Sequence, residues 1–445
     1  YVAVAWRLPD GSRLEPIPAN NLIPFDALAT APTTTTPSTT TPSTVTGTKA
    51  RITVTFASAP ATATARIAPA LYNKTRVLQF EEDDSPVSLY TDIYPVLKGG
   101  VASNGVRYPG LRFTDGCGHS RTYTAAAALN GHNPYNNAIW MDPGAQHDAT
   151  KLLWTQAQEL LNNGWDMENH SDLHTATNPA QQMAGLDALI TSRLNGYKPS
   201  VMVVPTNYAG YCTAAFGAGY IAASSSSQND NLPVFNPYTD RRVALSTLPA
   251  PTIPFVFQRY NADQVYGEYE QGQISRLNAI STDLMAAGTA GEVYSQRVFA
   301  HSMDVGVFAS WMNYTQSIAQ DQLWVTSLRE FAEYRRMSTQ VVKSETLSGN
   351  TFTVDLDYAG ISANTRFQNL TLLVNSPGTI TNITVTGADS SSLNLATKMV
   401  NIFRHEAATT TTAPPTSGSG TGCSGTGSLT REQWSNLGGT GLAAT

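Results

Sequence analysis

Hydrophobic residues follow a repeating rhythm through the middle of the chain. Between residues 76 and 337, short apolar runs alternate with longer stretches in which apolar residues recur every three or four positions. The short runs predict buried strands, and the longer stretches predict amphipathic helices. The predicted strands are VLQF at 77–80, VMVV at 201–204, PFVF at 254–257 and RVFA at 297–300. The predicted helices cover 148–163, 180–194, 271–287 and 321–336.

Strands that are spaced by helices favour a parallel α/β architecture, and we expect an irregular (β/α) barrel. At 49–67 the alternation of apolar and polar residues predicts a short antiparallel β element before the barrel. After residue 338 the helical rhythm stops, and runs such as TFTVDL, LTLLV and ITNITVTG are separated by Gly, Asn, Ser and Pro. These runs predict a small all-β, sandwich-like domain.

Two segments of low complexity divide the chain. They read TTTTPSTTTPST at 33–44 and TTTTAPPTSGSGTGCSGTG at 409–427. Segments of Thr, Pro, Ser and Gly bury too little apolar surface to offset their ordering entropy, so they predict linkers rather than long internal loops. We therefore expect a modular, secreted or cell-surface protein. Its predicted parts are linkers at 31–47 and 408–427, a barrel domain with its β element at 48–337, and a sandwich at 338–407.

Composition narrows the range of partners. The chain has 445 residues, a net charge of −6 and only 13% charged residues, where about 25% is usual. Such a chain cannot neutralise a phosphate backbone or an anionic lipid surface at low cost, so we expect no nucleic-acid partner. No apolar run reaches the length of about 18 residues that a membrane span requires, so we expect no membrane insertion.

The three cysteines, Cys117, Cys212 and Cys423, fit neither a zinc ribbon nor a disulfide-dense scaffold. A disulfide between Cys117 and Cys212 and two free thiols are both compatible with the sequence.

Two clusters of polar residues carry candidate chemistry. The first, FEEDDSP at 80–86, directly follows the predicted strand VLQF. Ligands and catalytic groups collect at the carboxyl ends of parallel strands, although consecutive acidic residues also occur in solvated turns. The second, ENHSDLH at 168–174, has histidines four positions apart, which would place both imidazoles on one face of a helical turn. An acidic strand end in the same domain favours a shared metal site over two unrelated surface histidines.

Together these motifs resemble the NodB-homology polysaccharide deacetylases, carbohydrate esterase family 4, over about residues 74–337. The family's Asp-Asp pair after a hydrophobic strand matches Asp83-Asp84, and its His-Ser/Thr-x-x-His motif matches HSDLH. The segment YTDIYPVLK at 90–98 resembles the helix that follows the first motif. Glu81-Glu82 could align with the acidic pair instead, but Ser85-Pro86 and the following helix favour Asp83-Asp84.

The resemblance implies that Asp84, His170 and His174 hold a divalent metal, most often zinc, and that Asp83 is the general base. A carboxylate and two neutral imidazoles leave open positions for water and substrate, as this chemistry requires. Ser171 would orient the histidine-bearing loop through hydrogen bonds.

The family's general acid is a histidine on a late strand. His301, directly after RVFA, is the candidate, and a buried core histidine is the alternative. The family's third motif carries an Arg before a Pro, but the matching stretch here, VMVVPTNYAGY at 201–211, has Pro205 and no Arg. Asp263 is a weak counterpart of a further acidic motif.

Other residues are candidates for contact with substrate. Pro205, Tyr208 and Tyr211 lie in the third-motif stretch, and Trp140 and Tyr260 are also expected near the rim of the predicted barrel. Aromatic rings can stack on sugars, although core packing is their commoner role. An extra segment at about 99–149, with Asp115 and His119, is expected to form a loop over the site.

The chain ends, 1–30 and 428–445, resemble the end and the beginning of the sugar-binding lectin module of anthrax protective antigen. The resemblances imply a secreted hydrolase that removes N- or O-linked acetyl groups from an acetylated polysaccharide. The alternative is a degenerate deacetylase-like domain that serves glycan binding or assembly in a cell-surface adhesin or filament. The missing Arg favours the alternative, and the complete Asp-Asp and HSDLH motifs oppose it.

Overall fold

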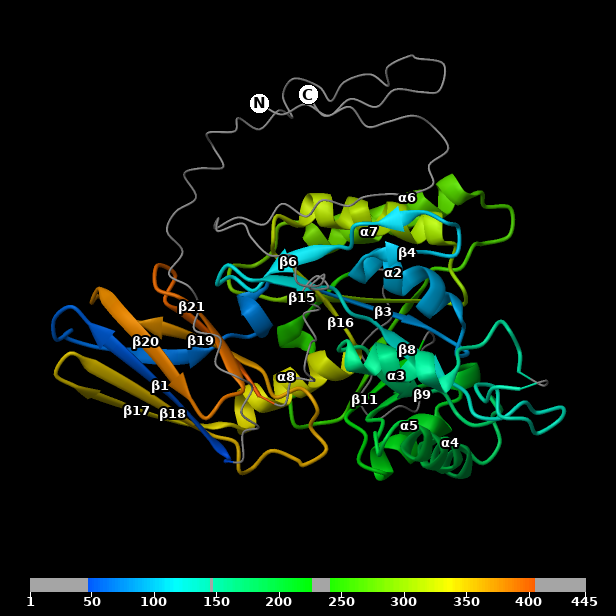
Figure 1. The fold of residues 1–445 in the computed structure, drawn as a ribbon, viewed down its shortest axis with the longest axis horizontal. Helices are drawn as coiled ribbons and strands as arrows, with labels where there is room; N and C mark the ends of the chain where they lie inside the picture. The colour runs from blue at the N-terminus through cyan, green and yellow to red at the C-terminus, as the bar shows by residue number, and fades with distance from the viewer. Residues whose placement is uncertain (1–46, 145–146, 226–240, 405–445) are drawn as a thin grey trace, which may run out of the picture. The chain divides into compact units, whose positions relative to one another are not determined.

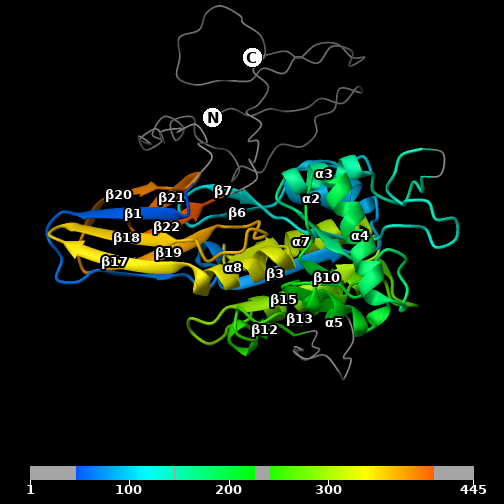
Figure 2. The ribbon, with the colours of Figure 1, turned by 90° about the horizontal axis from the view of Figure 1, so that it is seen from below.

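The structure of the chain is a computed structural model, and it describes residues 47–144, 147–225 and 241–404. Both lectin-like ends, and both linkers apart from residue 47, lie outside the described residues. The described part consists of a barrel of parallel strands and a sandwich of two antiparallel sheets (Figures 1 and 2). None of its helices is long and apolar enough to cross a membrane.

Parallel pairing runs round the barrel except at one junction, where one strand leads directly into the next along the chain. In order, the paired strands are β3 (Arg76–Glu82), β8 (Ala126–Leu129), β9 (Asp166–Asn169), β10 (Val201–Val203), β11 (Ala222–Ser225) and β13 (Phe255–Gln258). The next strands along the ring are β14 (Tyr260–Asn261) and β15 (Tyr294–Ala300). β14 follows β13 after one residue and pairs with β15, and β15 pairs with β3 along its whole length. The predicted irregular (β/α) barrel is therefore confirmed.

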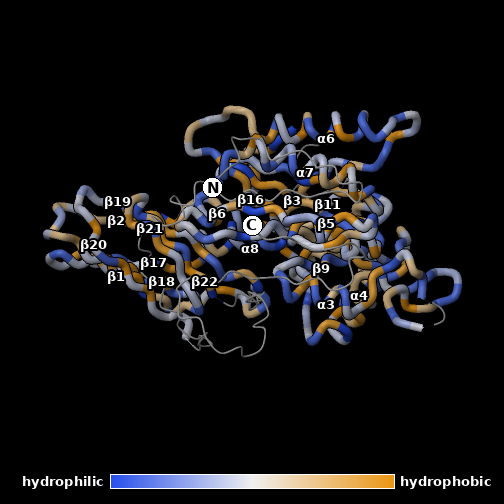
Figure 3. Tube along the Cα trace, turned by 45° about the horizontal axis from the view of Figure 1, so that its top comes forward, coloured by the Kyte–Doolittle hydropathy of each residue, from blue (hydrophilic) through white to orange (hydrophobic). Residues whose placement is uncertain are grey.

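The irregularity lies beside β3. Strand β16 (Leu323–Thr326) pairs with the first half of β3, whereas β8 pairs only with its last two residues. A short strand, β12 (Val243–Ala244), pairs antiparallel with β15. All seven residues of β3 are buried, as expected for a parallel strand covered on both faces. Figure 3 shows hydrophobic stretches running through the strands of the barrel.

Helices follow most of the barrel strands and cover the barrel (Figure 1). They include α2 (Tyr94–Lys98), α3 (Trp154–Asn162), α4 (Pro179–Arg193), α5 (Gly210–Gly217), α6 (Glu270–Met285), α7 (Val305–Ala319) and α8 (Leu328–Gln340). Side-chain caps fix two of the starts. The Asp304 carboxylate accepts hydrogen bonds from the first turn of α7, and Ser327 Oγ accepts one from Glu330 N of α8.

The predicted strands at 77–80 and 297–300 lie within β3 and β15, and those at 201–204 and 254–257 overlap β10 and β13, so all four strands are confirmed with boundaries shifted by one residue in the last two. The helix predicted at 321–336 is wrong in its first part, because LWVT at 323–326 forms β16 and the helix starts only after Ser327. The helix predicted at 148–163 starts late, at Trp154. Helix α7 was missed, since it is apolar on most sides and shows little amphipathic rhythm.

The sandwich draws its strands from both sides of the barrel sequence. One sheet has the order β17 (Val342–Ser348), β18 (Thr351–Asp357), β1 (Lys49–Phe56), β20 (Ile380–Thr386). The other has the order β2 (Thr64–Ile67), β19 (Leu370–Asn375), β22 (Met399–Phe403), β21 (Ser390–Asn394). We expected 49–67 to belong to the barrel domain, but it supplies one strand to each sheet. The side chains of β1 alternate between exposed and buried positions, so one face of the strand is buried. Strands β18 and β20 pair with β1 on either side and extend the sheet.

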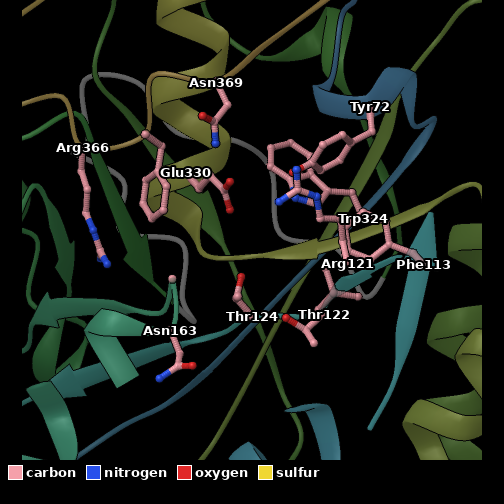
Figure 4. Close-up of a pocket in the computed structure, with 13 residues that line it drawn as sticks. Tyr72, Phe113, Arg121, Thr122, Thr124, Asn163, Trp324, Glu330, Arg366 and Asn369 are labelled. Carbon is pink, nitrogen blue, oxygen red and sulfur yellow. The ribbon is translucent and has the colours of Figure 1, made fainter. Parts of the chain in front are cut away.

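Polar contacts fasten the sandwich to the barrel. The Arg366 guanidinium donates to the carbonyls of Leu161 and Trp165, each at 2.6 Å, and Arg329 Nη2 donates to Asn364 O at 2.7 Å. A cavity of about 80 Å³ lies between the two parts, at the end of β3 remote from the acidic cluster (Figure 4). Its lining includes Tyr72, Phe113, Arg121, Trp324, Glu330 and Arg366.

Cys117 and Cys212 are both free, so the disulfide alternative is not found. Cys212 is buried in α5, whereas Cys117 lies on a loop against Met399 of the sandwich. Cys423 lies outside the described residues.

Candidate active site

The acidic pair sits on a sharp turn at the carboxyl end of β3. Asp83 N donates to Ala300 O of β15, and Ser85 N donates to Ala128 O of β8, each at 3.0 Å. Asp84 and Ser85 have positive φ values of 69° and 54°, which non-glycine residues seldom adopt outside constrained sites. The turn buries Asp83 almost completely but leaves the Asp84 side chain 36% exposed. The two neighbouring carboxylates therefore face different surroundings.

The HSDLH motif is not helical, so the predicted one-face geometry is wrong. Ser171 and His174 have positive φ values of 70° and 53°, and the segment forms an irregular bend after β9. His174 N donates to Ser171 Oγ at 3.0 Å, and Ser171 N donates to Asn169 Oδ1 at 2.8 Å. Local hydrogen bonds of this kind compete with helical ones. The bend brings the two imidazole centroids to 4.8 Å apart.

Asp84, His170 and His174 converge, with one ligand atom from each lying within 4.8 Å of the others. Asp84 Oδ1 is 3.6 Å from His170 Nε2 and 3.7 Å from His174 Nε2. Two ligands each about 2.1 Å from a tetrahedral zinc ion lie about 3.4 Å apart. The separations therefore suit a common cation.

The state of His170 points to the same conclusion. Its Nδ1 lies 2.9 Å from Val203 O, to which it donates, and its buried Nε2 has no hydrogen-bond partner. Burial lowers the pKa of His170 to about 4, so the ring is neutral at pH 7. An unprotonated Nε2 that faces the carboxylates of Asp83 and Asp84 is unfavourable unless a cation lies between them. The residues thus fit a divalent metal with the ligand set that zinc prefers.

Asn130 connects the two motifs. Its backbone N–H donates to Ser85 Oγ at 2.9 Å, and its side-chain amide donates to the carbonyls of His170 and Ser171. Next to it, a Cβ on Gly131 would lie 1.9 Å from an Asp172 carboxylate oxygen, so a side chain there would displace Asp172. These contacts fix the separation between the acidic turn and the histidine bend.

Neither glutamate of the acidic run takes the place of Asp84. Glu82 turns away and accepts hydrogen bonds from Ser88 Oγ and Met303 N, each at 2.8 Å. Burial raises the pKa of Glu82 to about 8, so it adds little negative potential near the histidines at neutral pH. Glu81 points into the barrel instead. Asp83-Asp84, and not Glu81-Glu82, is therefore the acidic pair that faces the two histidines.

A guanidinium that the sequence reasoning missed holds the predicted base. Arg259 Nη1 donates to Asp83 Oδ1 at 2.6 Å and to Glu81 Oε1 at 2.8 Å. Burial alone would raise the pKa of Asp83, but Arg259, followed by His170 and His301, outweighs burial and lowers it. Asp83 is therefore ionised at neutral pH. Arg259 directly follows β13, so its place at the carboxyl end of a predicted strand was the signal that could have identified it.

The barrel interior continues this pairing of charges. Arg297 is fully buried and forms ion pairs with both Glu81 and Glu168. Its Nη2 donates to Glu168 Oε2 at 2.7 Å, and its Nε donates to Ser224 Oγ at 2.8 Å. Acidic and basic side chains thus alternate from Glu168 to Asp83, and their contacts offset part of the cost of burying them. The apolar run RVFA gave no sign that its first side chain is the centre of an ion network.

His301 lies on the other side of the base. Its Nε2 is 3.8 Å from Asp83 Oδ2, and its Nδ1 lies 2.7 Å from Asp263 Oδ2. The hydrogen bond to Asp263 is the main cause of a raised pKa for His301, and burial opposes it. The side chain is 45% exposed, so the alternative of a buried core histidine is not found. A protonated imidazole beside an ionised carboxylate can serve as a general acid.

The remaining candidates for contact with substrate differ in how far their side chains are exposed to solvent. Tyr208 is 46% exposed, but Tyr211 and Pro205 are buried and cannot present a surface to substrate. The Tyr211 hydroxyl instead donates to Thr175 O at 2.5 Å, which supports the loop that follows His174. Trp140 and Tyr260 are half-buried.

The segment at 99–149 does not act as one loop over the site. Asp115 is fully buried and accepts hydrogen bonds from the backbone N–H groups of Cys117 and His119. Asn401 of β22 donates to Asp115 O at 2.7 Å, so this part is anchored to the sandwich. The segment also contains β8, a strand of small alanines that lacks the usual β-branched residues.

No family model matches the chain, and no curated protein is similar to it. Among solved structures, the Streptococcus pyogenes deacetylase PplD in complex with acetate matches 34% of this chain and 56% of its own length, at 14% identity and a TM-score of 0.24. A family 4 carbohydrate esterase from Streptomyces lividans in complex with acetate matches 56% of this chain and 92% of its own, at 11% identity and a TM-score of 0.32. The peptidoglycan deacetylase PdaC from Bacillus subtilis matches 59% and 92%, at 12% identity and a TM-score of 0.31. At these sequence identities and TM-scores, the activity of this chain has to be inferred from its own side chains.

Proposed function

We propose that the chain is a metal-dependent hydrolase that removes acetyl groups from an extracellular polysaccharide. The proposal rests on the convergence of Asp84, His170 and His174. Beside them lie Asp83, the proposed base, and His301, the proposed acid. Two titratable groups whose surroundings move their pKa values in opposite directions suit acid and base roles at one pH.

The side chains have separate tasks in this reaction. A divalent cation held by Asp84, His170 and His174 would supply a polarised water at neutral pH and a positive charge for the developing oxyanion. Asp83, ionised and fixed by Arg259, accepts the proton of the attacking water. His301, oriented by Asp263, donates a proton to the departing nitrogen or oxygen of the sugar. Acetate and the free amine or hydroxyl are the products.

Metal analysis and acetate release test the proposal together. We expect about one zinc ion per chain after purification and release of acetate from acetylated chitin, acetylated xylan or peptidoglycan fragments. Metal without acetate release from any of the three would favour the alternative, a degenerate domain that binds or assembles with glycan. Absence of both bound metal and acetate release would exclude the enzymatic function. The missing third-motif Arg no longer favours the alternative, since Arg259 contacts the base.

The pairing of His301 with Asp263 predicts a shift in the pH–rate profile. A general acid must be protonated, and the raised pKa of His301 keeps it protonated to higher pH. In an Asp263→Asn variant this pKa should fall, so the alkaline limb of the profile should move to lower pH while the acid limb stays in place. Acetate release measured between pH 5 and pH 10 checks the shift. An unchanged alkaline limb would show that His301 is not the acid.

A further inference from the structure

One buried carboxylate lies at the centre of the polar interior of the barrel. Glu81 Oε1 accepts hydrogen bonds from Ser224 Oγ at 2.9 Å and from Arg259 Nη1 at 2.8 Å. Arg297 contacts both oxygens of the same carboxylate, because its Nε donates to Oε1 at 3.2 Å and its Nη2 forms an ion pair with Oε2. All four side chains are buried, and they come from β3, β11, the residue after β13, and β15. Glu81 therefore joins side chains from four places round the barrel.

Arg297 also reaches the strand that leads to the histidine bend. Its Nη2 donates to Glu168 Oε2 on β9 at 2.7 Å. Glu168 lies two residues before His170, and Glu81 lies two residues before Asp83. Two residues along a strand span about 6.7 Å. One guanidinium thus ties β9 to β3 just before the histidine bend and the acidic turn begin.

The backbone alone connects these two strands weakly. Strand β8 lies between β3 and β9 (Figure 1), and it pairs with the last two residues of β3. By register, Ala126 and Ala128 of β8 point to the same side as the two glutamates. Their side chains are short, so they leave space for Arg297 to contact both glutamates across β8. The spacing between the acidic turn and the histidine bend therefore depends on side-chain contacts such as these.

Stability is a weak explanation for this arrangement. A buried ion pair is often no more stabilising than apolar side chains of the same volume. Arg297 and its two acidic partners are fully buried, so a displaced guanidinium or carboxylate would be left buried without a partner. The contacts therefore favour one relative position of the two strands. A metal site with ligands that follow both strands requires such a fixed position.

We propose that Arg297 is a positioning residue of the candidate metal site. Through Glu168 and Glu81 it holds the histidine bend and the acidic turn at the spacing that a shared metal requires, and through Glu81 it holds Arg259 against the base. The inference rests on the proposed function for its effect on turnover. Its effect on metal binding can be measured without turnover.

The test compares Arg297→Met with Arg329→Met in the full chain. Arg329 is a matched control because it is also buried, pairs with Glu333 at 2.8 Å, and lies 3.7 Å from Asp166, the first residue of β9. Both variants should unfold at a lower urea concentration, since each leaves a buried carboxylate without its guanidinium. Zinc affinity, measured by competition with a fluorescent chelator, should fall about 10- to 100-fold in Arg297→Met. It should not change in Arg329→Met.

Two further measurements make the test specific. With zinc in excess, kcat of Arg297→Met on an acetylated substrate should fall about tenfold or more while KM changes little, because the base loses its fixed position. Arg297→Lys keeps the buried charge, so it is expected to fold even if Arg297→Met does not. Its zinc affinity should still be lower than that of the wild type, because the shorter lysine side chain cannot place its ammonium where Arg297 Nη2 contacts both Glu81 and Glu168.

Wild-type zinc affinity in folded Arg297→Met, or in Arg297→Lys where the methionine variant does not fold, would overturn the inference. An equal loss of zinc affinity in Arg329→Met would also overturn it, since the loss would then follow stability and not position. A wild type that binds zinc but releases no acetate would contradict the proposed function alone, and the comparison of zinc affinities would still decide this inference.

Discussion

An Asp84→Ala variant should lose the metal and, with it, acetate release. Among the described residues, Asp84 Oδ1 is the one carboxylate oxygen near both Nε2 atoms, at 3.6 Å and 3.7 Å, so its removal leaves two imidazole ligands. Metal content should fall from about one ion per chain to trace levels, and acetate release should fall to that of a sample without enzyme. Elemental analysis after gel filtration and an acetate assay check both values.

The Asp84 side chain is partly exposed, and among the described residues its charge partners are only the two histidines, so the variant should still fold. A matched control is Asp355→Ala, which removes an exposed carboxylate of the sandwich and should keep both metal and activity. Full metal content in Asp84→Ala would contradict the ligand assignment, even if activity were lost.

Replacing Arg259 with methionine should have the second large effect. The change keeps an unbranched apolar side chain but leaves the carboxylates of Asp83 and Glu81 buried, with Asp83 lacking its only guanidinium contact among the described residues. Breaking a buried ion pair in this way costs about 3–5 kcal/mol of stability. We also expect kcat to fall by about 10²-fold or more, because the base loses its fixed position. KM should change little.

Urea unfolding and steady-state kinetics on an acetylated substrate separate the two effects. Arg259→Lys should recover part of the stability, since it restores the charge, but less of kcat, because the shorter lysine side chain cannot place its ammonium where Arg259 Nη1 contacts both Asp83 and Glu81. Arg51→Met, which removes an exposed pair in the sandwich, should change neither quantity measurably. A wild-type kcat in folded Arg259→Met would show that Arg259 does not position the base.

The sequence predicted best those parts of the site in which the reactive residues directly follow a recognisable strand. The strand VLQF ends at an acidic run, and the turn after β3, in which Asp84 has a positive φ of 69°, puts Asp84 and not Glu82 beside the histidines. The two histidines were paired correctly but for the wrong local reason. Four-residue spacing suggested a helix, whereas the bend depends on Ser171 and His174 adopting positive φ values that no sequence rule required.

Other features depend on long-range contacts that the local pattern does not contain. Arg259 and Arg297 lie within or beside apolar runs, and only the closed barrel brings them to Glu81, which is at least 178 residues away along the chain. The same applies to β1, which reads as an isolated strand but pairs with β18 about 300 residues later. The segment at 323–326 was assigned to a helix because the helix that follows it continues its apolar rhythm.

The most direct test of the account is a comparison of the wild type with an Asp83→Asn variant, measuring bound metal and released acetate on the same samples. Asp83 is proposed to act as the general base and is not one of the three proposed metal ligands, so the variant should keep the full complement of metal. Its acetate release should fall by about 10²- to 10⁴-fold, the usual contribution of general acid–base catalysis. Acetate release by Asp83→Asn at the wild-type rate, or a wild type with bound metal that releases no acetate from any acetylated polysaccharide, would contradict the account.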